Sequence, residues 1–245
     1  MRQNKKASVI ILAGGQGLRV RTVYPDIPKP MIPVNGRPFI EWIIQYFMHQ
    51  GVQRFVISLG YLSHVAEEYF RQRKADGAVI TTVCEPSPLG TGGALLLAQR
   101  AVPLNDPLII ANGDSLVLME LSRVWEILED PGIDGIILGI RVQDTSRYGS
   151  LKTGPDGLLC AFHEKRAGCG LINAGVIFFK RRLLTHFPNR TPLSLENEMF
   201  PALLENGAKI LVYPCEAPFL DIGTPEGVVE AGDFIAKLFP LGDSI

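Results

Sequence analysis

Short apolar runs alternate with helix-forming segments through the first half of the chain. The run 8–12 is aliphatic after Ser8, which is typical of a strand covered on both faces. Further strands are predicted at 55–59, 79–83 and 108–111, and helices at 39–50, 64–74, 94–100 and 121–128. Such alternation predicts right-handed crossovers, and therefore a mainly parallel, doubly wound sheet with helices on both faces.

The second half of the chain is less regular. Strands are predicted at 136–142, 176–180 and 210–213, a hairpin at 149–152 with 158–163, and helices near 181–187, 195–205 and 226–238. No stretch has the composition of a linker, a repeat or a low-complexity segment. The 245 residues therefore predict a single α/β domain with a mixed, mainly parallel sheet in a three-layer, Rossmann-like arrangement.

Composition excludes several classes of protein. Apolar residues make up 47% of the chain and charged residues 20%, with a net charge of −1, which is unlike a disordered chain. The lack of a basic excess argues against a nucleic-acid partner. No apolar run approaches the roughly 20 residues that span a bilayer, so no membrane partner is expected.

The cysteines and the N-terminal residues bear on location. Cys84, Cys160, Cys169 and Cys215 form no C-x-x-C pair, which is typical of free thiols in a reducing compartment. Basic residues before the apolar run 7–12 imitate a secretion signal, but about six apolar residues are fewer than a normal signal core. We therefore expect a first strand and a cytoplasmic protein. The apolar last helix, near 228–239, could serve either the core or an interface in a homo-oligomer.

The strongest local signal directly follows the first predicted strand. Leu12 and Ala13 lead into Gly14-Gly15-Gln16-Gly17-Leu18-Arg19, where three glycines would let backbone N–H groups approach an anion. Arg19 adds a planar fork of donors for phosphate oxygens. The loop fits neither the dinucleotide fingerprint, which Val20 breaks, nor the Walker loop, which needs Gly-Lys-Ser/Thr. The alternative is a tight turn that serves the fold alone.

Two further segments are predicted to reach the same ligand. Lys29 lies between Pro28 and Pro30, which should make the backbone stiff and extended and hold the ammonium group in place. The loop 85–93, with Glu85, Gly90 and Thr91, follows the third predicted strand, and a parallel sheet would place it beside the glycine loop. The alternatives are a solvated lysine and a structural loop.

Two aspartates are candidate metal ligands. Asp114, in Asn112-Gly113-Asp114, ends the fourth predicted strand, and Asp221, in Asp221-Ile222-Gly223-Thr224, again lies between a strand and a helix. Mg²⁺ takes one or two carboxylates together with substrate phosphates. The two aspartates can serve one ion only if their strands end at a shared edge of the sheet; otherwise each is a turn or cap residue.

Weaker signals lie between the two aspartates. Arg147-Tyr148-Gly149, Glu164-Lys165 and Asn173-Ala174-Gly175 each place hydrogen-bonding groups beside a strand end or a glycine. The four histidines show neither metal-ligand spacing nor a nucleophilic partner, so no base-activated nucleophile is predicted.

In this order, the motifs resemble the sugar-1-phosphate nucleotidyltransferases over nearly the whole chain. Within that family, stretches such as 26–31, 88–94, 170–175 and 219–224 are most similar to members that act on a heptose 1-phosphate. The sequence departs from the family at Leu18, where threonine is usual, and at Arg166, where many members have proline.

The resemblance implies a nucleotide-binding half, 1–115, and a sugar-phosphate-binding half, 116–245. For the nucleoside triphosphate it implies Leu12, Ala13, Gly14, Gly15, Gly17, Arg19, Lys29, Glu85, Gly90, Thr91 and Asn112. For the sugar 1-phosphate it implies Gly113, Tyr148, Gly149, Glu164, Lys165 and Asn173. It also implies that Arg19, Lys29 and Asp114 are catalytic, and that Asp114 and Asp221 bind Mg²⁺.

The implied reaction joins the two substrates and releases pyrophosphate. A sugar phosphate is mostly a dianion at pH 7, because its second pKa is about 6, and so it needs no general base. Glu85 favours GTP, because guanine presents two adjacent donors to an acceptor-only carboxylate. If Glu85 is instead solvated, UTP, dTTP, CTP or ATP with a hexose 1-phosphate stay open.

Two other classes of protein compete with this interpretation. A nucleotide-sugar-dependent glycosyltransferase commonly carries an Asp-x-Asp metal motif, whereas Ser115 and Leu116 follow Asp114 here. A non-catalytic nucleotide-sugar sensor would not need the full set of charged residues that the chain retains.

Overall fold

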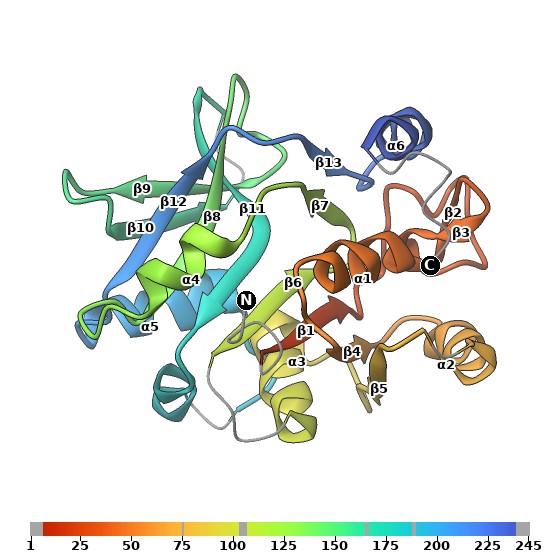
Figure 1. Cartoon of the computed structure of the whole chain (residues 1–245), viewed down its shortest axis with the longest axis horizontal. Helices are drawn as coiled ribbons and strands as arrows, with labels where there is room; N and C mark the ends of the chain where they lie inside the picture. The colour runs from red at the N-terminus through yellow and green to blue at the C-terminus, as the bar shows by residue number, and fades with distance from the viewer. Residues whose placement is uncertain (1–6, 75, 103–106, 165–166, 188–189, 239–245) are drawn as a thin grey trace.

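The computed structural model describes residues 7–74, 76–102, 107–164, 167–187 and 190–238 (Figure 1). Within these residues, nine strands form one sheet: β1 (Ser8–Ala13), β4 (Arg54–Leu59), β5 (Val79–Cys84), β6 (Leu108–Asn112), β8 (Gly135–Val142), β9 (Gly149–Thr153), β10 (Leu159–Glu164), β11 (Gly170–Phe179) and β12 (Ile210–Cys215). Their order is β10-β9-β11-β6-β1-β4-β5, and β8 pairs with β11 and β12. The predicted fold class, a three-layer α/β fold with a large mixed sheet, is confirmed.

Strand β1 lies inside the parallel part of the sheet. It pairs with β4 on one side and β6 on the other, so that Ile11 lies between Ile57 and Ala111. Strand β5 continues the parallel part beyond β4. The carboxyl ends of these four strands therefore share one edge of the sheet, where ligands of open α/β sheets bind.

Helices cover both faces of this sheet: α1 (Phe39–His49), α2 (Ser63–Gln72), α3 (Gly90–Ala98), α4 (Ser122–Leu128) and α5 (Phe200–Glu205). Helix α6 (Pro225–Leu238) lies beyond them and contacts β13 (Phe219–Asp221) and β2 (Pro33–Val34). Side chains of a strand alternate between faces, so Val9 and Ile11 of β1 join one buried cluster and Ile10 joins the other. The first cluster includes α1, α4 and α6, and the second includes α3 and α5.

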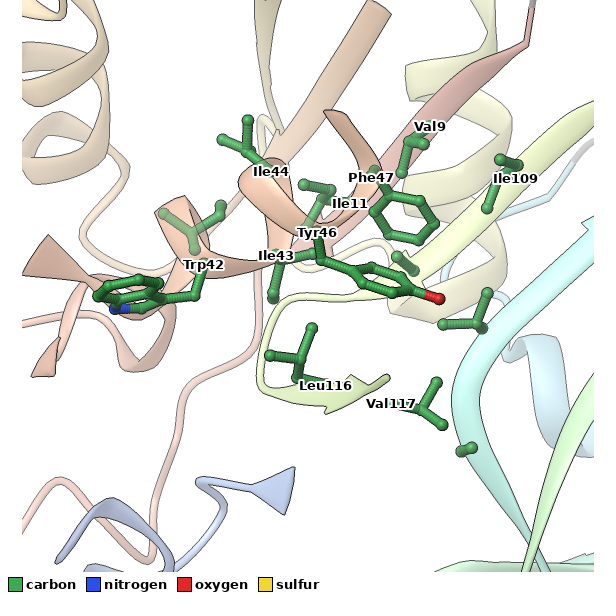
Figure 2. Packing of buried hydrophobic residues seen from close by; sticks show 14 of the residues in the cluster. Val9, Ile11, Trp42, Ile43, Ile44, Tyr46, Phe47, Ile109, Leu116 and Val117 are labelled. Carbon is green, nitrogen blue, oxygen red and sulfur yellow. The ribbon is translucent and has the colours of Figure 1, made fainter. Parts of the chain in front are cut away.

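Figure 2 shows the first cluster beneath α1. Ile43 and Phe47 come from the helix and pack toward Val9, Ile11 and the neighbouring strand β6. Phe47 and Ile43 are each 1% exposed, because the helix presents its apolar face to the sheet. This packing fixes the central strands whose ends carry the candidate site.

Strand β11 joins the parallel strands to the second half of the chain. One of its edges pairs with β9 at Leu171 and with β6 at Val176, while the other edge pairs with β8. The pairing with β8 is interrupted between Asn173 and Ile177, where Gly175 has a φ of 81°. This irregularity lies beside Asn112, at the end of β6.

The structure contains two small sheets that the sequence did not predict. β2 (Pro33–Val34) pairs with β3 (Arg37–Pro38), and β7 (Ser115–Val117) pairs with β13 (Phe219–Asp221). Segments of two or three residues are too short for an apolar periodicity to reveal them. The second pairing brings distant parts of the chain together at the end of β6.

Some helix predictions are wrong in detail. Helix α3 begins at Gly90 rather than at residue 94, and the predicted helix 181–187 is a 3₁₀ helix, Arg181–His186. The predicted helix 195–205 divides into a π-helical turn, η5 (Leu195–Met199), and α5, with Pro201 in the first turn of α5. Proline has no backbone N–H to continue a helix from the preceding turn.

The last helix serves the core. Val228, Ala231 and Ile235 of α6 are buried in the first cluster, whereas Val229 is exposed. Among the described residues, no helix has the length and apolar character needed to cross a bilayer.

Candidate active site

A cavity of about 580 Å³ lies at the carboxyl ends of the parallel strands. The segments that follow β1, β4, β5 and β6 all contribute to it. Its lining residues are Leu12, Ala13, Gly14, Gly15, Gln16, Lys29, Pro30, Gly60, Tyr61, Glu85, Ser87, Pro88, Gly90, Thr91, Ala94, Asn112, Gly113, Asp114 and Glu196. The predicted triphosphate loop and the predicted loop 85–93 therefore do lie side by side.

Each of the three glycines in the first loop is required for a different structural reason. A Cβ at Gly14 would strike the Glu85 carboxylate, and the Gly14 carbonyl accepts the Tyr61 N–H at 3.2 Å. Gly17 has a φ of 59°, a conformation that favours glycine. Apart from its two chain neighbours, a Cβ at Gly15 would meet no atom of the described residues within 4 Å, and Gly15 has no positive φ. Gly15 is thus open to a ligand in the cavity.

Lys29 forms an ion pair with Asp114 inside the cavity. The Nζ–Oδ2 distance is 2.5 Å, and the two side chains are 14% and 32% exposed. The backbone at Lys29 is not extended as predicted, because Lys29–Met31 forms a 3₁₀ turn in which the Met31 N–H donates to the Pro28 carbonyl. Pro28 itself is extended, with φ −65° and ψ 141°.

The two predicted metal ligands, Asp114 and Asp221, lie next to each other. In the β7–β13 pair Asp221 is opposite Ser115, and the Ile222 N–H donates to the Asp114 carbonyl at 3.0 Å. Burial and the charge of Asp114 both raise the pKa of the Asp221 carboxyl, while the Gly223 N–H opposes the shift. The condition that both aspartates share one edge is therefore met.

The donor set at this edge fits a magnesium ion. Burial and, after it, the charge of Asp114 raise the pKa of Asp221, and a divalent cation would relieve the repulsion between the two carboxylates. Mg²⁺ is bound through one or two carboxylates together with substrate phosphates. Asp114 and Asp221 would therefore hold the ion, and the phosphates of the bound substrate would complete its coordination.

Arg19 and Tyr148 lie on the Asp221 side of the site rather than in the cavity wall. The Arg19 guanidinium is 3.2 Å from the position that a Cβ of Gly223 would take. Tyr148 packs edge-on against Phe219, at 6.0 Å between ring centroids, and burial and the Asp221 charge raise the pKa of its hydroxyl.

Arg147 also approaches Asp221. Its guanidinium is 3.9 Å from the Asp221 carboxylate and 3.4 Å from the Thr224 hydroxyl, and it lies over the Tyr148 ring. Arg147 was singled out only as part of a weak motif, because a single arginine in a sequence does not reveal which carboxylate it will approach.

The predicted sugar-phosphate residues Gly149, Glu164 and Asn173 lie on β9, β10 and β11. Gly149 pairs with Glu164, and a Cβ at Gly149 would strike the Phe162 ring, so packing alone accounts for this glycine. Asn173 accepts the Gly175 N–H at 3.0 Å within the irregular part of β11. Lys165 lies outside the described residues. Gly149 and Asn173 do not line the cavity of about 580 Å³.

Glu85 is built into the cavity wall. Its Oε2 accepts the Leu89 N–H at 3.0 Å, and its other oxygen lies against Gly14. Burial raises the pKa of this carboxyl, and the Leu89 N–H opposes the shift. Glu85 is therefore not a freely solvated side chain at the loop edge.

The glycines of the 85–93 loop are explained by packing within the chain. The Gly92 and Gly93 N–H groups both donate to the Leu193 carbonyl, at 2.8 and 3.1 Å, and a Cβ at Gly92 would strike Met199. The sequence favoured a ligand wall for this loop, with a structural loop as the alternative, and the packing of these glycines supports the structural role as well. Sequence reasoning missed Glu196 and Tyr61 in the cavity, because Glu196 comes from a segment about a hundred residues away that shows only a helical pattern.

The comparison with known families gives the class of the protein. The nucleotidyl transferase family matches residues 8–237, and the chain belongs to this family. The predicted resemblance to the sugar-1-phosphate nucleotidyltransferases is confirmed.

Individual relatives are about a third identical to the chain over the aligned residues. It is 33% identical over 221 residues to D-glycero-alpha-D-manno-heptose 1-phosphate guanylyltransferase of Campylobacter jejuni, covering 89% of this chain and 95% of the relative. It is 32% identical over 240 residues to mannose-1-phosphate guanylyltransferase of Mycobacterium tuberculosis, covering 96% of this chain but only 66% of that longer protein.

A solved structure agrees with these relatives. HddC from Yersinia pseudotuberculosis, complexed with GMP-PN, superposes with a TM-score of 0.79 at 31% identity, covering 92% of this chain and 98% of that one. The fold and the family are thus supported by sequence and by structure.

Proposed function

We propose that this protein transfers a nucleoside monophosphate from a nucleoside triphosphate, with GTP favoured, to a sugar 1-phosphate, with D-glycero-D-manno-heptose 1-phosphate favoured. The observation that carries the proposal is the meeting of the glycine loop, the Lys29–Asp114 ion pair and Asp221 at one edge of the sheet. The products are a nucleoside diphosphate sugar and pyrophosphate.

The chemistry requires charge neutralisation more than proton transfer. A phosphate oxygen of the sugar 1-phosphate forms a bond to the α-phosphorus, and the bond from that phosphorus to pyrophosphate breaks. Both reactants are anions, so Lys29, Arg19 and the N–H groups of the glycine loop would bind the triphosphate and reduce the repulsion. Correct positioning of the two reactants in line supplies much of the remaining acceleration.

A magnesium ion held by Asp114 and Asp221 would neutralise charge on the phosphates. Lys29 is paired with Asp114, so that neither group is left as an uncompensated charge in the partly buried site. The role of the chain is to hold these groups before the substrates arrive.

Support for GTP comes from Glu85 and from the relatives. A carboxylate in the cavity wall can accept the two adjacent donors of guanine, whereas uracil and thymine offer one donor flanked by acceptors. Two of the relatives are named guanylyltransferases, and the solved structure holds GMP-PN.

Support for a heptose 1-phosphate comes from chain length and identity. The heptose enzyme of Campylobacter jejuni matches this chain over 95% of its own length. The mannose enzyme of Mycobacterium tuberculosis has a third of its length outside the match. A mannose-type hexose 1-phosphate is the second candidate acceptor.

A substrate screen tests the proposed function. Purified protein is incubated with Mg²⁺, one of five nucleoside triphosphates and one of a panel of sugar 1-phosphates. Pyrophosphatase then converts the released pyrophosphate to phosphate, which is measured. We expect pyrophosphate only when both substrates are present, with the highest rate for GTP and the heptose. Release of a nucleoside diphosphate from a nucleotide sugar would indicate a glycosyltransferase, and binding without turnover would indicate a sensor.

The Glu85→Gln variant tests the source of base preference. Glutamine retains one acceptor but adds a donor where guanine also donates, so we expect the preference for GTP over UTP to fall about tenfold or more. An unchanged preference would remove Glu85 from the argument and leave the transfer reaction itself intact.

A further inference from the structure

Residues 191–199, here called the crossing segment, connect the second half of the chain to the cavity. The Leu193 N–H donates to the Leu89 carbonyl at 2.8 Å, and the Leu193 carbonyl accepts the N–H groups of Gly92 and Gly93. Leu193 and Met199 are 1% and 0% exposed. The crossing segment is thus fastened to the first turn of α3 by backbone hydrogen bonds and by buried side chains.

This attachment brings Glu196 into the cavity wall. Glu196 Oε2 accepts hydrogen bonds from the hydroxyls of Thr91, at 2.6 Å, and Ser194, at 3.2 Å. The Thr91 hydroxyl in turn accepts the Leu195 N–H at 2.9 Å. Within the described part of the chain, no hydrogen bond is found to Glu196 Oε1. One oxygen orients the side chain, and the other keeps its acceptor capacity for a ligand.

The charge of Glu196 defines what it can bind. A carboxylate repels phosphate groups. In the proposed function the phosphates bind to Lys29 and to the glycine loop at the end of β1, which line the same cavity. A fixed, partly buried carboxylate instead accepts hydrogen bonds from neutral donors. Both substrates of the proposed reaction carry such donors: the ribose hydroxyls of the nucleotide and the hydroxyls of the sugar 1-phosphate.

We propose that Glu196 is a specificity-determining residue that accepts a hydrogen bond from a substrate hydroxyl, and that Thr91 positions its carboxylate. This inference rests on the proposed function for the identity of the two substrates. It also gives a reason for the glycines at 90, 92 and 93: they let the crossing segment approach closely enough for Glu196 to reach the cavity.

The variant Glu196→Gln has a matched control on the same turn. Glu198 pairs with Arg190 and accepts the Ser194 N–H at 2.8 Å, and it does not line the cavity. Both substitutions remove one negative charge from η5, so the comparison separates the cavity contact from general effects of charge or of folding. Thermal unfolding of each variant checks that the fold is retained.

Two equilibrium measurements identify the source of the hydroxyl. Binding of GTP, 2′-deoxy-GTP and 3′-deoxy-GTP by calorimetry tests the ribose, and binding of GDP-mannose relative to GDP tests the sugar. Loss of one hydrogen bond to a charged acceptor should weaken binding about 10- to 100-fold. In one of these two arms, Glu196→Gln should lose discrimination between the ligands, whereas Glu198→Gln should retain it.

A double-mutant cycle tests the role of Thr91. Thr91→Val should weaken binding in the same arm as Glu196→Gln, and the two substitutions together should do little more than Glu196→Gln alone. If Glu196→Gln and Glu198→Gln discriminate the ligands in both arms as the wild type does, the proposal is overturned. Because these measurements are of binding, a wild type that binds GTP without turnover would refute the proposed function and not this inference.

Discussion

Gly14 and Gly15 are neighbours in the sequence, but different constraints act on them. Gly14 has no room for a side chain, because the Glu85 carboxylate and the backbone of Gly60 lie against it. Gly15 has room, since beyond its chain neighbours no atom in the described part of the chain lies within 4 Å of its Cβ position. A glycine with open space and an ordinary φ, in the wall of a cavity, is explained by close approach of a ligand.

A pair of alanine substitutions separates these two roles. We expect Gly15→Ala to unfold at the wild-type temperature but to lose about 10- to 100-fold in kcat/KM for the triphosphate, as reacting groups misplaced by 1 Å do. Gly14→Ala should lower the unfolding temperature as well. Thermal unfolding and initial rates of pyrophosphate release measure both. A Gly15→Ala variant with wild-type kinetics would show that the loop does not contact the triphosphate.

The place of a residue in the fold can be predicted where its chain position fixes that place. Gly15, Lys29 and Asp114 follow apolar strands or rigid turns, so a parallel sheet places them at one edge. Glu196 could not be found in this way, because its position depends on the packing of the crossing segment against α3. The pattern of residues 195–205 predicts a helix and says nothing of what that helix contacts.

Among the secondary-structure elements, the start of β8 is held by one aspartate. Asp134 accepts two hydrogen bonds of 2.8 Å, one from the Lys209 N–H, next to β12, and one from Arg182 Nε, next to β11. Its side chain is 17% exposed. Burial by itself would raise the pKa of Asp134, but these hydrogen bonds and the Arg182 charge hold the pKa below its ordinary value. Asp134 thereby fastens three strands of the second half.

This pKa shift predicts a pH-dependent stability. The ionised Asp134 should contribute about 1–2 kcal/mol to the free energy of unfolding above the ordinary aspartate pKa of about 3.9. That contribution should disappear as the pH falls through the lower pKa of the folded state. Asp134→Asn should therefore be less stable than the wild type at pH 7, with the difference shrinking below about pH 4.

Denaturant unfolding between pH 7 and pH 3 measures this difference. Glu126→Gln is the control, because the Arg123–Glu126 pair is exposed and should be worth less than about 1 kcal/mol. A stability difference between Asp134→Asn and wild type that does not change with pH would contradict the assignment.

The elements also show why their boundaries were harder to predict than their order. Helix α3 begins four residues earlier than predicted, because the Leu193 carbonyl accepts the N–H groups of Gly92 and Gly93. A run of glycines has a poor intrinsic helix propensity, and only this distant contact reverses it. The pairing of β7 with β13 was missed for the same reason, since it too depends on a distant partner.

In the whole molecule, one sheet crosses the predicted boundary at residue 115. Strand β6 belongs to the first half and pairs with β11 of the second, and the first buried cluster contains residues from Ala7 to Ile235. The halves predicted to bind the two substrates thus share their core and their sheet.

A shared core predicts cooperative unfolding. We expect a single transition in scanning calorimetry, with equal calorimetric and van't Hoff enthalpies, because neither half can keep its sheet without the other. Fluorescence and far-ultraviolet circular dichroism should give the same midpoint. Two resolved transitions would mean that the halves are separate domains.

The central claim is that Asp114 and Asp221 act together at one site for transfer of a nucleoside monophosphate. The most direct measurement is a double-mutant cycle on the rate of pyrophosphate formation, with Asp114→Asn, Asp221→Asn and the double variant. We expect each single variant to lose at least about 100-fold in kcat, and the double variant to lose little more than the worse of the two, because residues that act as a unit are not additive. Losses that multiply, or an Asp221→Asn variant with the wild-type rate, would contradict the account.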